Sequence, residues 1–350
     1  MYFSARSILF NLFFDSQFCG SRKFSLSVRK LLFLQLAWIP PYLCFANYFE
    51  RSLLPLRLMC YTQTELLFGG HRLAHGSVEG CIDKVFGESF SKSPPSSLCV
   101  FDGTFSVLKT PKLRPDLERV VVVRSAPNSF DYREYVRDTW QKKLSPDLPV
   151  IFVVGLGNDV SSECDEYGDI LWTDFVDSYR NLTLKMTTTY RFLLNQFPRL
   201  KQVIVVNDDT IVNATSLRQL SSLHDTGGRY VVGKVSIGYP RLFFQNLLWY
   251  VGSDVFPHKC YPPFVQGSSF IISADAARQV IEQICKFPFV HLDDIMMGIM
   301  ANCLDIEMRH KFGFDRHVLD QFVVYHYQWS RFSPEKMREQ WRRANKMNIF

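Results

Sequence analysis

Short apolar runs alternate with amphipathic segments from Leu117 to the C-terminus of the 350-residue chain. Continuous apolar runs are typical of strands buried on both faces of a sheet, whereas apolar positions three and four residues apart are typical of helices. The pattern predicts strands at Val120–Val123, Pro149–Val154, Ile170–Trp172, Val203–Val206, Tyr230–Val235, Phe270–Ile272 and Phe322–Tyr325. It predicts helices at Tyr132–Gln141, Leu184–Asn195, Ser216–Leu223, Ala274–Cys285, Ile295–Cys303 and Pro334–Asn345. Strands that alternate with helices indicate an α/β domain with a mostly parallel sheet.

The N-terminal segment has a different pattern. Four basic residues between positions 22 and 30 precede the uncharged apolar run Leu31–Phe49, whose nineteen residues are about the length that crosses a bilayer as a helix. Positive charge on its N-terminal flank predicts a cytoplasmic tail at 1–30, a transmembrane signal anchor at 31–49 and a lumenal remainder. Two prolines weaken a helix here, and a cleaved signal peptide or a buried helix of a soluble protein are the alternatives.

Residues 50–115 have weak periodicity, scattered glycines and a cluster of helix-breaking residues at Ser91–Ser97. This pattern predicts a lumenal stem with little core of its own, followed by the folded domain at 116–346. Seven cysteines lie beyond the anchor, and none forms the C-x-x-C spacing of a zinc site. In an oxidising lumen some would pair and at least one would be left over. Sequons at Asn181 and Asn213 have meaning only in that compartment.

Composition and charge narrow the class of protein. A hydrophobic content of 47% with 21% charged residues is ordinary for a globular protein with a sizeable core. The net charge of +6 is modest, and no run of Lys and Arg is longer than two residues. This distribution argues against nucleic acid as a partner and fits mild attraction to anionic ligands.

An acidic segment, Asn207-Asp208-Asp209, directly follows the predicted strand Val203–Val206. Open α/β sheets bind their ligands at the carboxyl ends of strands, and paired carboxylates there suit a divalent cation that carries phosphates. An Asp-rich turn is the alternative. A second pair, Asp293-Asp294, begins the predicted helix Ile295–Cys303, where helix capping is the ordinary explanation.

Several further segments become informative when they are taken in order along the chain. They are Arg124-Ser125-Ala126 with Arg137-Asp138-Thr139-Trp140, Glu166–Leu171 with Asp174–Lys185, Asn207-Asp208-Asp209, Tyr261–Phe264 with Gly267 and Ser273, and Leu292–Ile295 with Gly298. Together they resemble the motifs of the inverting β1,3-galactosyl- and β1,3-N-acetylglucosaminyltransferases, to which the Fringe enzymes are related. The order and spacing match from about Leu117 to Trp341. The resemblance implies a GT-A-like (Rossmann-like) domain and a Golgi membrane protein with a single N-terminal anchor and a lumenal catalytic domain.

The family's reaction, as the resemblance implies it, transfers a hexose or N-acetylhexosamine, galactose foremost, from a UDP-sugar with inversion. The acceptor would be a hydroxyl of a glycan on a glycoprotein or glycolipid, in β1,3 linkage. An alternative is a weak or inactive relative that binds glycans or assists a partner transferase. Asn207 in place of the family's first Asp and Asp293 in place of its Glu favour this alternative, while Asp209, Asp294 and His326 favour the enzyme.

The resemblance also implies which residues carry the chemistry. Asp209 is expected to bind the metal together with His326, and a carboxylate with an imidazole suits Mn²⁺ better than Ca²⁺. For His326 the alternative is a strand-end histidine that makes only a hydrogen bond. Asp294 is expected to act as the base that deprotonates the acceptor hydroxyl. Asp293 shares the start of its helix, and either residue is also suited to capping.

Donor binding is expected from the residues around these two acidic pairs. Asn207 is expected to contact the ribose, and Asp208 to contact the ribose or support the metal. Arg124 and Lys185 are candidates for contacts with the diphosphate, and fixing the loop before Trp140 is the alternative for Arg124. Core packing is the alternative for three candidate acceptor-stacking residues, Trp249, Tyr250 and Phe264.

Overall fold

The computed structural model describes residues 59–60, 77–87, 99, 101, 106–225, 227–241, 248–327 and 330–349. The chain divides into two compact units, Met1–Met59 and Cys60–Phe350, and all described residues except Met59 belong to the second. Its strands are β1 (Val107–Lys109), β2 (Arg119–Arg124), β3 (Val150–Leu156), β4 (Ile170–Val176), β5 (Gln202–Asn207), β6 (Thr210–Val212), β7 (Tyr230–Ser236), β8 (Phe264–Ser273), β9 (Glu307–His310) and β10 (Val324–His326).

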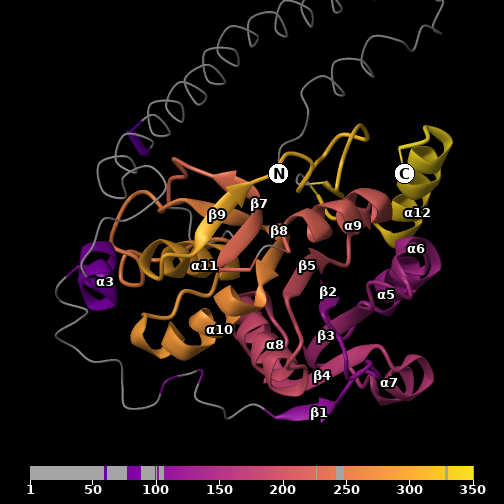
Figure 1. The fold of residues 1–350 in the computed structure, drawn as a ribbon, viewed down its shortest axis with the longest axis horizontal. Helices are drawn as coiled ribbons and strands as arrows, with labels where there is room; N and C mark the ends of the chain where they lie inside the picture. Colours follow the sequence, from indigo (N-terminus) through magenta and orange to yellow (C-terminus); the bar gives the residue numbers. More distant parts are fainter. Residues whose placement is uncertain are drawn as a thin grey trace, which may run out of the picture. The chain divides into compact units, whose positions relative to one another are not determined.

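Helices surround these strands (Figure 1). The α-helices are α3 (Val78–Phe86), α5 (Phe130–Val136), α6 (Lys142–Leu144), α7 (Ser161–Tyr167), α8 (Leu182–Gln196), α9 (Ala214–Leu223), α10 (Ala274–Gln283), α11 (Asp293–Cys303) and α12 (Pro334–Lys346). Three shorter pieces are the π-helix η1 (Arg137–Gln141) and the 3-10 helices η2 (Tyr179–Asn181) and η3 (Ile284–Lys286).

Eight strands form one mixed sheet in the order β1-β4-β3-β2-β5-β8-β7-β9. The central strands β4, β3, β2 and β5 are parallel, whereas β8 is antiparallel to both β5 and β7. A separate two-stranded sheet pairs β10 with β6. The predicted α/β fold, with a mostly parallel sheet between helices, is confirmed.

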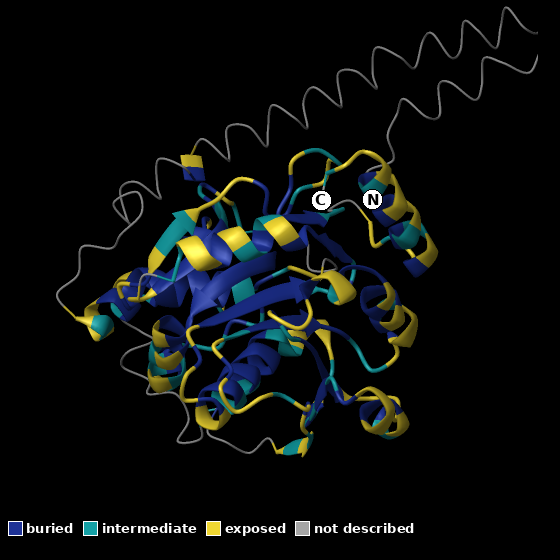
Figure 2. Cartoon of the chain, turned by 45° about the vertical axis from the view of Figure 1, so that its right-hand side comes forward, coloured by how far each residue is buried: buried dark blue, intermediate teal, exposed yellow. Residues whose placement is uncertain are grey.

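Each sheet face carries its own hydrophobic core because side chains alternate along a strand. In β2, Val120 and Val122 join the core that α3, α8, α10 and α11 cover, while Val121 and Val123 join the core under α5, α9 and α12. Figure 2 shows the strands as buried and the outer helix faces as exposed. The continuous apolar runs therefore have the two-sided burial that their composition predicts.

The predicted helix Tyr132–Gln141 is instead three consecutive pieces, α5, η1 and α6. Within them, the Tyr135 hydroxyl donates to the carbonyl of Thr210 over 2.9 Å, and Nε1 of Trp140 donates to the same carbonyl over 3.0 Å. These two residues are five positions apart, and the i→i+5 bonding of a π turn brings such positions onto one face. The junction of α5 and η1 thus directs two aromatic donors to Thr210, the first residue of β6, directly after Asp209.

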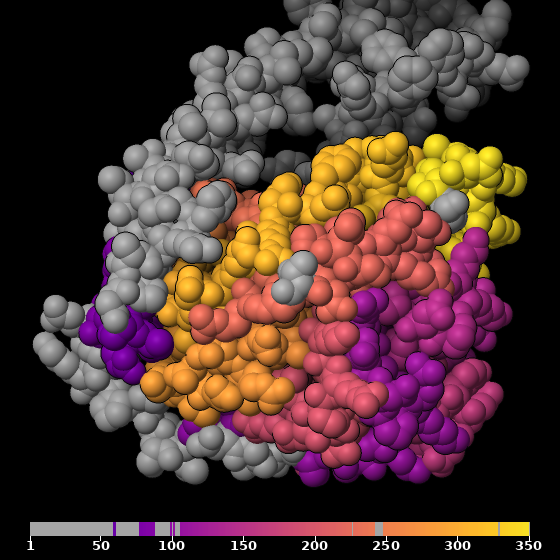
Figure 3. Space-filling model, in the orientation of Figure 1, coloured from indigo at the N-terminus to yellow at the C-terminus, as the bar shows by residue number. Residues whose placement is uncertain are grey.

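The range 50–115, expected as a stem, contributes part of the folded unit in its described residues. Helix α3 buries Cys81, Ile82, Val85 and Phe86 and packs against α11, and Figure 3 shows its indigo atoms beside orange ones. Disulfides join this range to distant positions: Cys60–Cys260, Cys81–Cys303 and Cys99–Cys285. The folded unit therefore extends N-terminally of residue 116, because covalent links and an amphipathic helix hold these residues to it.

Two further sequence predictions concern processing and the membrane. Asn213 is buried as the N-cap of α9, and its side-chain amide donates to the Ile349 carbonyl over 2.8 Å. Its side chain is therefore not accessible to glycosylation in the folded chain. Asn181 is half-buried and donates to the Val176 carbonyl.

Among the described residues no helix is long and apolar enough to cross a bilayer. The predicted anchor at 31–49 lies outside these residues.

We expect Cys81→Ser to lower the free energy of unfolding by about 2–5 kcal/mol, because a cross-link between positions 222 residues apart strongly restricts the unfolded chain. Urea unfolding followed by tryptophan fluorescence measures the change. Cys164→Ala is the matched control, since Cys164 is buried and is the free cysteine among the described residues. A loss for Cys81→Ser no larger than for the control would show that the disulfide does not stabilise this fold.

Candidate active site

The two predicted acidic segments meet at the carboxyl ends of β2 and β5. These parallel strands lie side by side (Figure 1). Arg124 at the end of β2 is in register with Asn207 at the end of β5. Because β3 and β5 flank β2 on opposite sides, the chain order reverses at this point of the sheet. Ligands of open α/β sheets bind at such reversals.

Arg124 joins these segments directly. Its Nε and Nη2 atoms donate to Oδ1 of Asn207 over 3.1 and 2.7 Å, and its Nη1 donates to Asp293. Nη2 also donates to the carbonyl of Gly267. The side chains of Arg124 and Asp293 are only 6% and 9% exposed, so this ion pair is largely shielded from water. One guanidinium therefore holds the end of β5 against the first turn of α11.

Asp294, the predicted base, lies beside this ion pair. Its Oδ1 accepts from the backbone N–H of Ile295 over 2.8 Å, and its Oδ2 accepts from that of Gly267 over 3.3 Å. Burial, followed by the negative charge of Asp293, raises the pKa of Asp294 to about 7. A Cβ atom at position 267 would lie 3.2 Å from the Cβ of Asp294, so glycine permits this close approach. A carboxyl group with this pKa is suited to accept a proton near neutral pH.

Asp208 and Asp209 differ in their surroundings. Asp208 is buried, and it accepts from the Ser125 hydroxyl over 2.9 Å and from Nη2 of Arg331 over 2.6 Å. Burial raises its pKa to about 6, with Arg331 opposing and Asp209 adding to the shift. Asp209 is nearer the surface, and its Oδ1 lies 3.7 Å from Nε2 of His326.

His326 is brought to Asp209 by the small second sheet. Strand β10 pairs with β6 so that His326 lies opposite Thr210, the residue after Asp209. Its Nδ1 is 2.9 Å from Oδ1 of Asp315. Burial opposes a charged imidazole, but the hydrogen bond to Asp315 and the charges of Asp209 and Asp315 outweigh it and raise the pKa of His326.

The donor atoms here fit a divalent cation with a limited number of protein ligands. Across the described residues, no three side chains of His, Cys, Asp or Glu are grouped as a metal site. Asp209 and Nε2 of His326 are nonetheless adjacent, and His326 uses its other nitrogen for Asp315. A carboxylate oxygen and one imidazole nitrogen suit a cation that takes its remaining ligands from phosphates and water.

Lys185 lies behind the site and is buried. Its ammonium donates to the Ser125 carbonyl over 2.8 Å and to both carboxylate oxygens of Asp177 over 2.9 and 2.7 Å. Burial lowers its pKa, although Asp177 opposes the shift. Lys185 thus fixes the backbone after β2. Its predicted contact with a diphosphate stays a prediction, which this position does not favour.

Arg331 is a residue that sequence reasoning missed. Besides its bond to Asp208, its Nε lies 3.9 Å from Asp209, and its guanidinium lies 3.9 Å from the ring centroid of Tyr132. The side chain is 46% exposed, so this cation faces solvent at the acidic pair. The sequence gives no signal for it, because a lone Arg before the Ser333 cap has no motif context.

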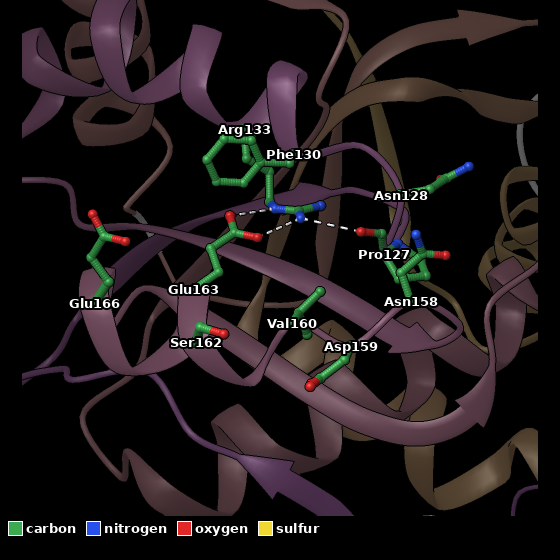
Figure 4. Close-up of a pocket in the computed structure, with 10 residues that line it drawn as sticks. All are labelled: Pro127, Asn128, Phe130, Arg133, Asn158, Asp159, Val160, Ser162, Glu163 and Glu166. Atoms are coloured by element: carbon green, nitrogen blue, oxygen red, sulfur yellow. Dashed lines mark hydrogen bonds and ion pairs between the residues drawn. The ribbon is translucent and has the colours of Figure 1, made fainter.

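A hollow of about 370 Å³ lies next to the site, between the loops that follow β2 and β3. Figure 4 shows Arg133 among the lining residues, with Glu163 beside it, and the two are paired over 2.7 and 2.6 Å. Arg133 also donates to the Ala126 carbonyl over 2.5 Å and to the Ser125 hydroxyl over 3.1 Å. Since Ser125 in turn donates to Asp208, this buried ion pair positions both the wall of the hollow and the acidic pair.

The predicted acceptor-stacking residues differ in their exposure to solvent. Phe264 is only 4% exposed and packs in the core, so the alternative interpretation holds for it. Trp249 is 49% exposed. Tyr239, which sequence reasoning missed, is 37% exposed and meets the ring of Phe264 edge-on, with 5.5 Å between centroids. Tyr239 and Trp249 therefore present exposed aromatic area, and Tyr239 does so beside β8.

Comparisons with known proteins agree with this arrangement. A sequence model of the galactosyltransferase family matches residues 131–311, just over half of the chain. Human lactosylceramide 1,3-N-acetyl-β-D-glucosaminyltransferase is 28% identical over 209 residues, which cover 55% of this chain and 55% of the relative. Human β1,3-galactosyltransferase 1 is 28% identical over 237 residues, which cover 63% of this chain and 72% of the relative. The chain thus spans about half the length of the first relative.

We expect Arg124→Met to lower the free energy of unfolding by about 3–5 kcal/mol, because it leaves the carboxylate of Asp293 buried without its partner. Adding Asp293→Asn to that variant should recover part of the loss. Chemical unfolding measures both. Arg114→Met is the control, since that side chain is 74% exposed and should change stability by less than about 0.5 kcal/mol. Equal, small effects at both positions would contradict a structural role for the Arg124–Asp293 pair.

Proposed function

The chain belongs to the galactosyltransferase family and is a glycosyltransferase, and we propose that it transfers a sugar from a UDP-sugar to a glycan hydroxyl in β1,3 linkage with inversion. The sugar is a hexose or N-acetylhexosamine, with galactose as the first expectation. One observation carries the proposal: Arg124 ties the end of β5, which leads into Asp208 and Asp209, to the first turn of α11, which bears Asp294. A candidate base and a candidate diphosphate site are thus held together.

The proposed chemistry divides between these two groups. Asp294 accepts the proton of the acceptor hydroxyl as its oxygen forms a bond to the anomeric carbon, while the bond to the UDP oxygen breaks. Attack from the side opposite the diphosphate inverts the anomeric carbon. A divalent cation, Mn²⁺ by preference, would supply charge stabilisation for the departing diphosphate, and Asp209 and His326 would hold it. Arg331 supplies a further positive charge on the same side.

The hollow beside Arg133 supports the proposal for the nucleoside end of the donor. Its lining includes Asn128, Asn158 and Asp159. Arg133, also in the lining, donates to the Ser125 hydroxyl, which in turn donates to Asp208. Amide and carboxylate groups can satisfy the mixed donors and acceptors of a pyrimidine base and a ribose. Asn207 and Asp208 would then lie between the nucleoside and the transferred sugar.

Departures from the family motif are compatible with activity. Asn207 uses its carbonyl oxygen to accept two hydrogen bonds from Arg124, a task that an amide can perform. The charge of Arg124 is balanced by Asp293. The inactive-relative alternative therefore lacks a structural observation in its favour, and we retain the enzyme.

The three disulfides support an oxidising compartment, as a lumenal Golgi domain on a membrane anchor would require. Acceptors on glycoproteins and on glycolipids both fit this setting.

A donor-panel assay tests the function itself. UDP-galactose, UDP-N-acetylglucosamine and UDP-N-acetylgalactosamine are each offered with Mn²⁺ and β-linked sugar acceptors, and the product linkage is read by NMR. We expect transfer from UDP-galactose in β1,3 linkage. Absence of transfer from every donor, together with absence of UDP binding, would refute the proposed reaction.

We expect Asp294→Asn to lower kcat by about 10²–10⁴-fold, the usual contribution of a positioned base, while the dissociation constant for UDP stays within about twofold. Steady-state kinetics and calorimetry measure the two quantities. Asp305→Asn is the matched control, since Asp305 is exposed and asparagine tolerates its positive φ. A kcat for Asp294→Asn close to that of the control would exclude Asp294 as the base.

The raised pKa of Asp294 also predicts the pH dependence. Because its pKa is about 7, the carboxylate form that accepts a proton predominates only above about pH 7. We therefore expect kcat/KM to rise with pH through 7 and to fall about tenfold for each pH unit below it. A profile that is flat between pH 5 and pH 8 would contradict a base with a raised pKa.

A further inference from the structure

We propose that Asp315 is a positioning residue that holds the imidazole of His326 with Nε2 toward Asp209, ready to bind the divalent cation of the donor site. The inference rests on the proposed function, because it concerns the metal site proposed there. Asp315 belongs to no motif that the sequence analysis used, and the geometry alone points to it.

The first step of the argument is the orientation of the ring. Nδ1 of His326 lies 2.9 Å from Oδ1 of Asp315, and Nε2 lies 3.7 Å from Oδ1 of Asp209. A carboxylate can only accept, so Nδ1 is the donor in the first contact. A neutral imidazole with its proton on Nδ1 has its free electron pair on Nε2. Asp315 thereby selects the nitrogen that is available to a cation.

The backbone fixes Asp315 and His326 relative to each other. The N–H of Arg316, the neighbour of Asp315, donates to the Val324 carbonyl over 3.0 Å, and the N–H of His326 donates to the Arg316 carbonyl over 2.8 Å. Strand β10 is paired in turn with β6, which begins directly after Asp209. Hydrogen bonds between backbone segments therefore fix the positions of Asp209, Asp315 and His326 relative to one another.

Two further side chains fix the carboxylate of Asp315, which is only 3% exposed. Ser268 of β8 donates to its Oδ1 over 2.6 Å, and the ammonium of Lys234 in β7 lies 3.2 Å from its Oδ2. Both carboxylate oxygens of Asp315 are thus held in place, and the group is a fixed acceptor, the kind of partner that orients histidine ligands in metal sites.

A purely structural role for Asp315 is the competing interpretation. In that case the carboxylate would serve only as the counter-ion of Lys234 and would join the loop before Arg316 to β7. Such a role predicts a loss of stability without a change in the protonated nitrogen of His326. The two interpretations therefore differ in a property of the imidazole itself.

The variant Asp315→Asn distinguishes the two interpretations, because an amide has one acceptor oxygen and one donor NH₂ group where the carboxylate has two acceptors. Lys234 has only donors, so the amide oxygen is expected to face Lys234 and the NH₂ group to face His326. The NH₂ group requires an acceptor at Nδ1, which moves the proton of the neutral ring to Nε2 and removes the electron pair there. Asparagine also tolerates the positive φ of 49° at this position, so the backbone is not strained by the change.

Two measurements follow on the full-length protein. With ¹⁵N-histidine labelling and no metal, at a pH where the ring is neutral, we expect the Nδ1–H form in the wild type and the Nε2–H form in Asp315→Asn. With UDP and Mn²⁺, electron paramagnetic resonance should show a dissociation constant for Mn²⁺ about 10–100-fold higher in the variant.

A rescue variant and a control sharpen the test. Adding Lys234→Met to Asp315→Asn frees the amide to turn its oxygen toward His326, so the Nδ1–H form and much of the Mn²⁺ affinity should return. Asp320→Asn is the matched control, since that partly exposed carboxylate pairs with Arg316 and has no contact with His326. It should leave both measurements unchanged.

The outcomes separate this inference from the proposed function. An Nδ1–H form that persists in Asp315→Asn, or a double variant with no recovery, overturns the role of Asp315. A switch to the Nε2–H form with unchanged Mn²⁺ affinity upholds the orientation by Asp315 and refutes His326 as a metal ligand. Loss of folded protein in Asp315→Asn, when Asp320→Asn folds normally, supports the structural interpretation and overturns ours.

Discussion

The buried guanidinium of Arg124 is the interaction on which the rest of this site depends. It lies at the end of β2, and it holds Asn207 of β5 on one side and Asp293 of α11 on the other. Asp293 pairs with Arg124, while burial and then the negative charge of Asp293 raise the pKa of the neighbouring Asp294. A second buried pair, Arg133–Glu163, holds Ser125 against Asp208 in the same way. The same charged groups therefore stabilise the fold and position the acidic residues of the candidate site. A substitution at one of them is expected to affect both stability and activity.

Much of the fold was predictable because a strand that is buried on both faces is a continuous apolar run in the sequence. Strands such as Val120–Val123 and Val203–Val206 are apolar throughout, and each is a central parallel strand. The short strands β6 and β9 were missed because three or four residues carry too little pattern to be separated from loops. Helix α3 was missed although its buried residues Cys81, Ile82, Val85 and Phe86 recur at helical spacing after the Ser77 cap. Its link to α11 could not be predicted, because cysteine spacing alone does not determine pairing.

The candidate site was predictable where residues belong to motifs and unpredictable where geometry alone unites them. Asp209, Asp294 and Asn207 stand next to strand or helix ends, and the structure brings their segments together. Lys185 was expected at the diphosphate but is buried against Asp177, because its place on the inner face of α8 sets its environment. Arg331 and Asp315 lie in irregular segments. Local sequence patterns do not predict the contacts that such side chains make with residues far away in the chain. Such residues can be found only when the tertiary contacts are known.

A crystal structure with UDP and Mn²⁺, recorded at the manganese absorption edge, tests the central claim most directly. The account predicts a single anomalous peak bonded to Asp209 and to Nε2 of His326, with the diphosphate on it and the nucleoside toward the hollow beside Arg133. Asp294 should remain on the acceptor side, bonded to the N–H of Gly267. A peak elsewhere in the protein, or UDP bound away from the ends of β2 and β5, would contradict the account.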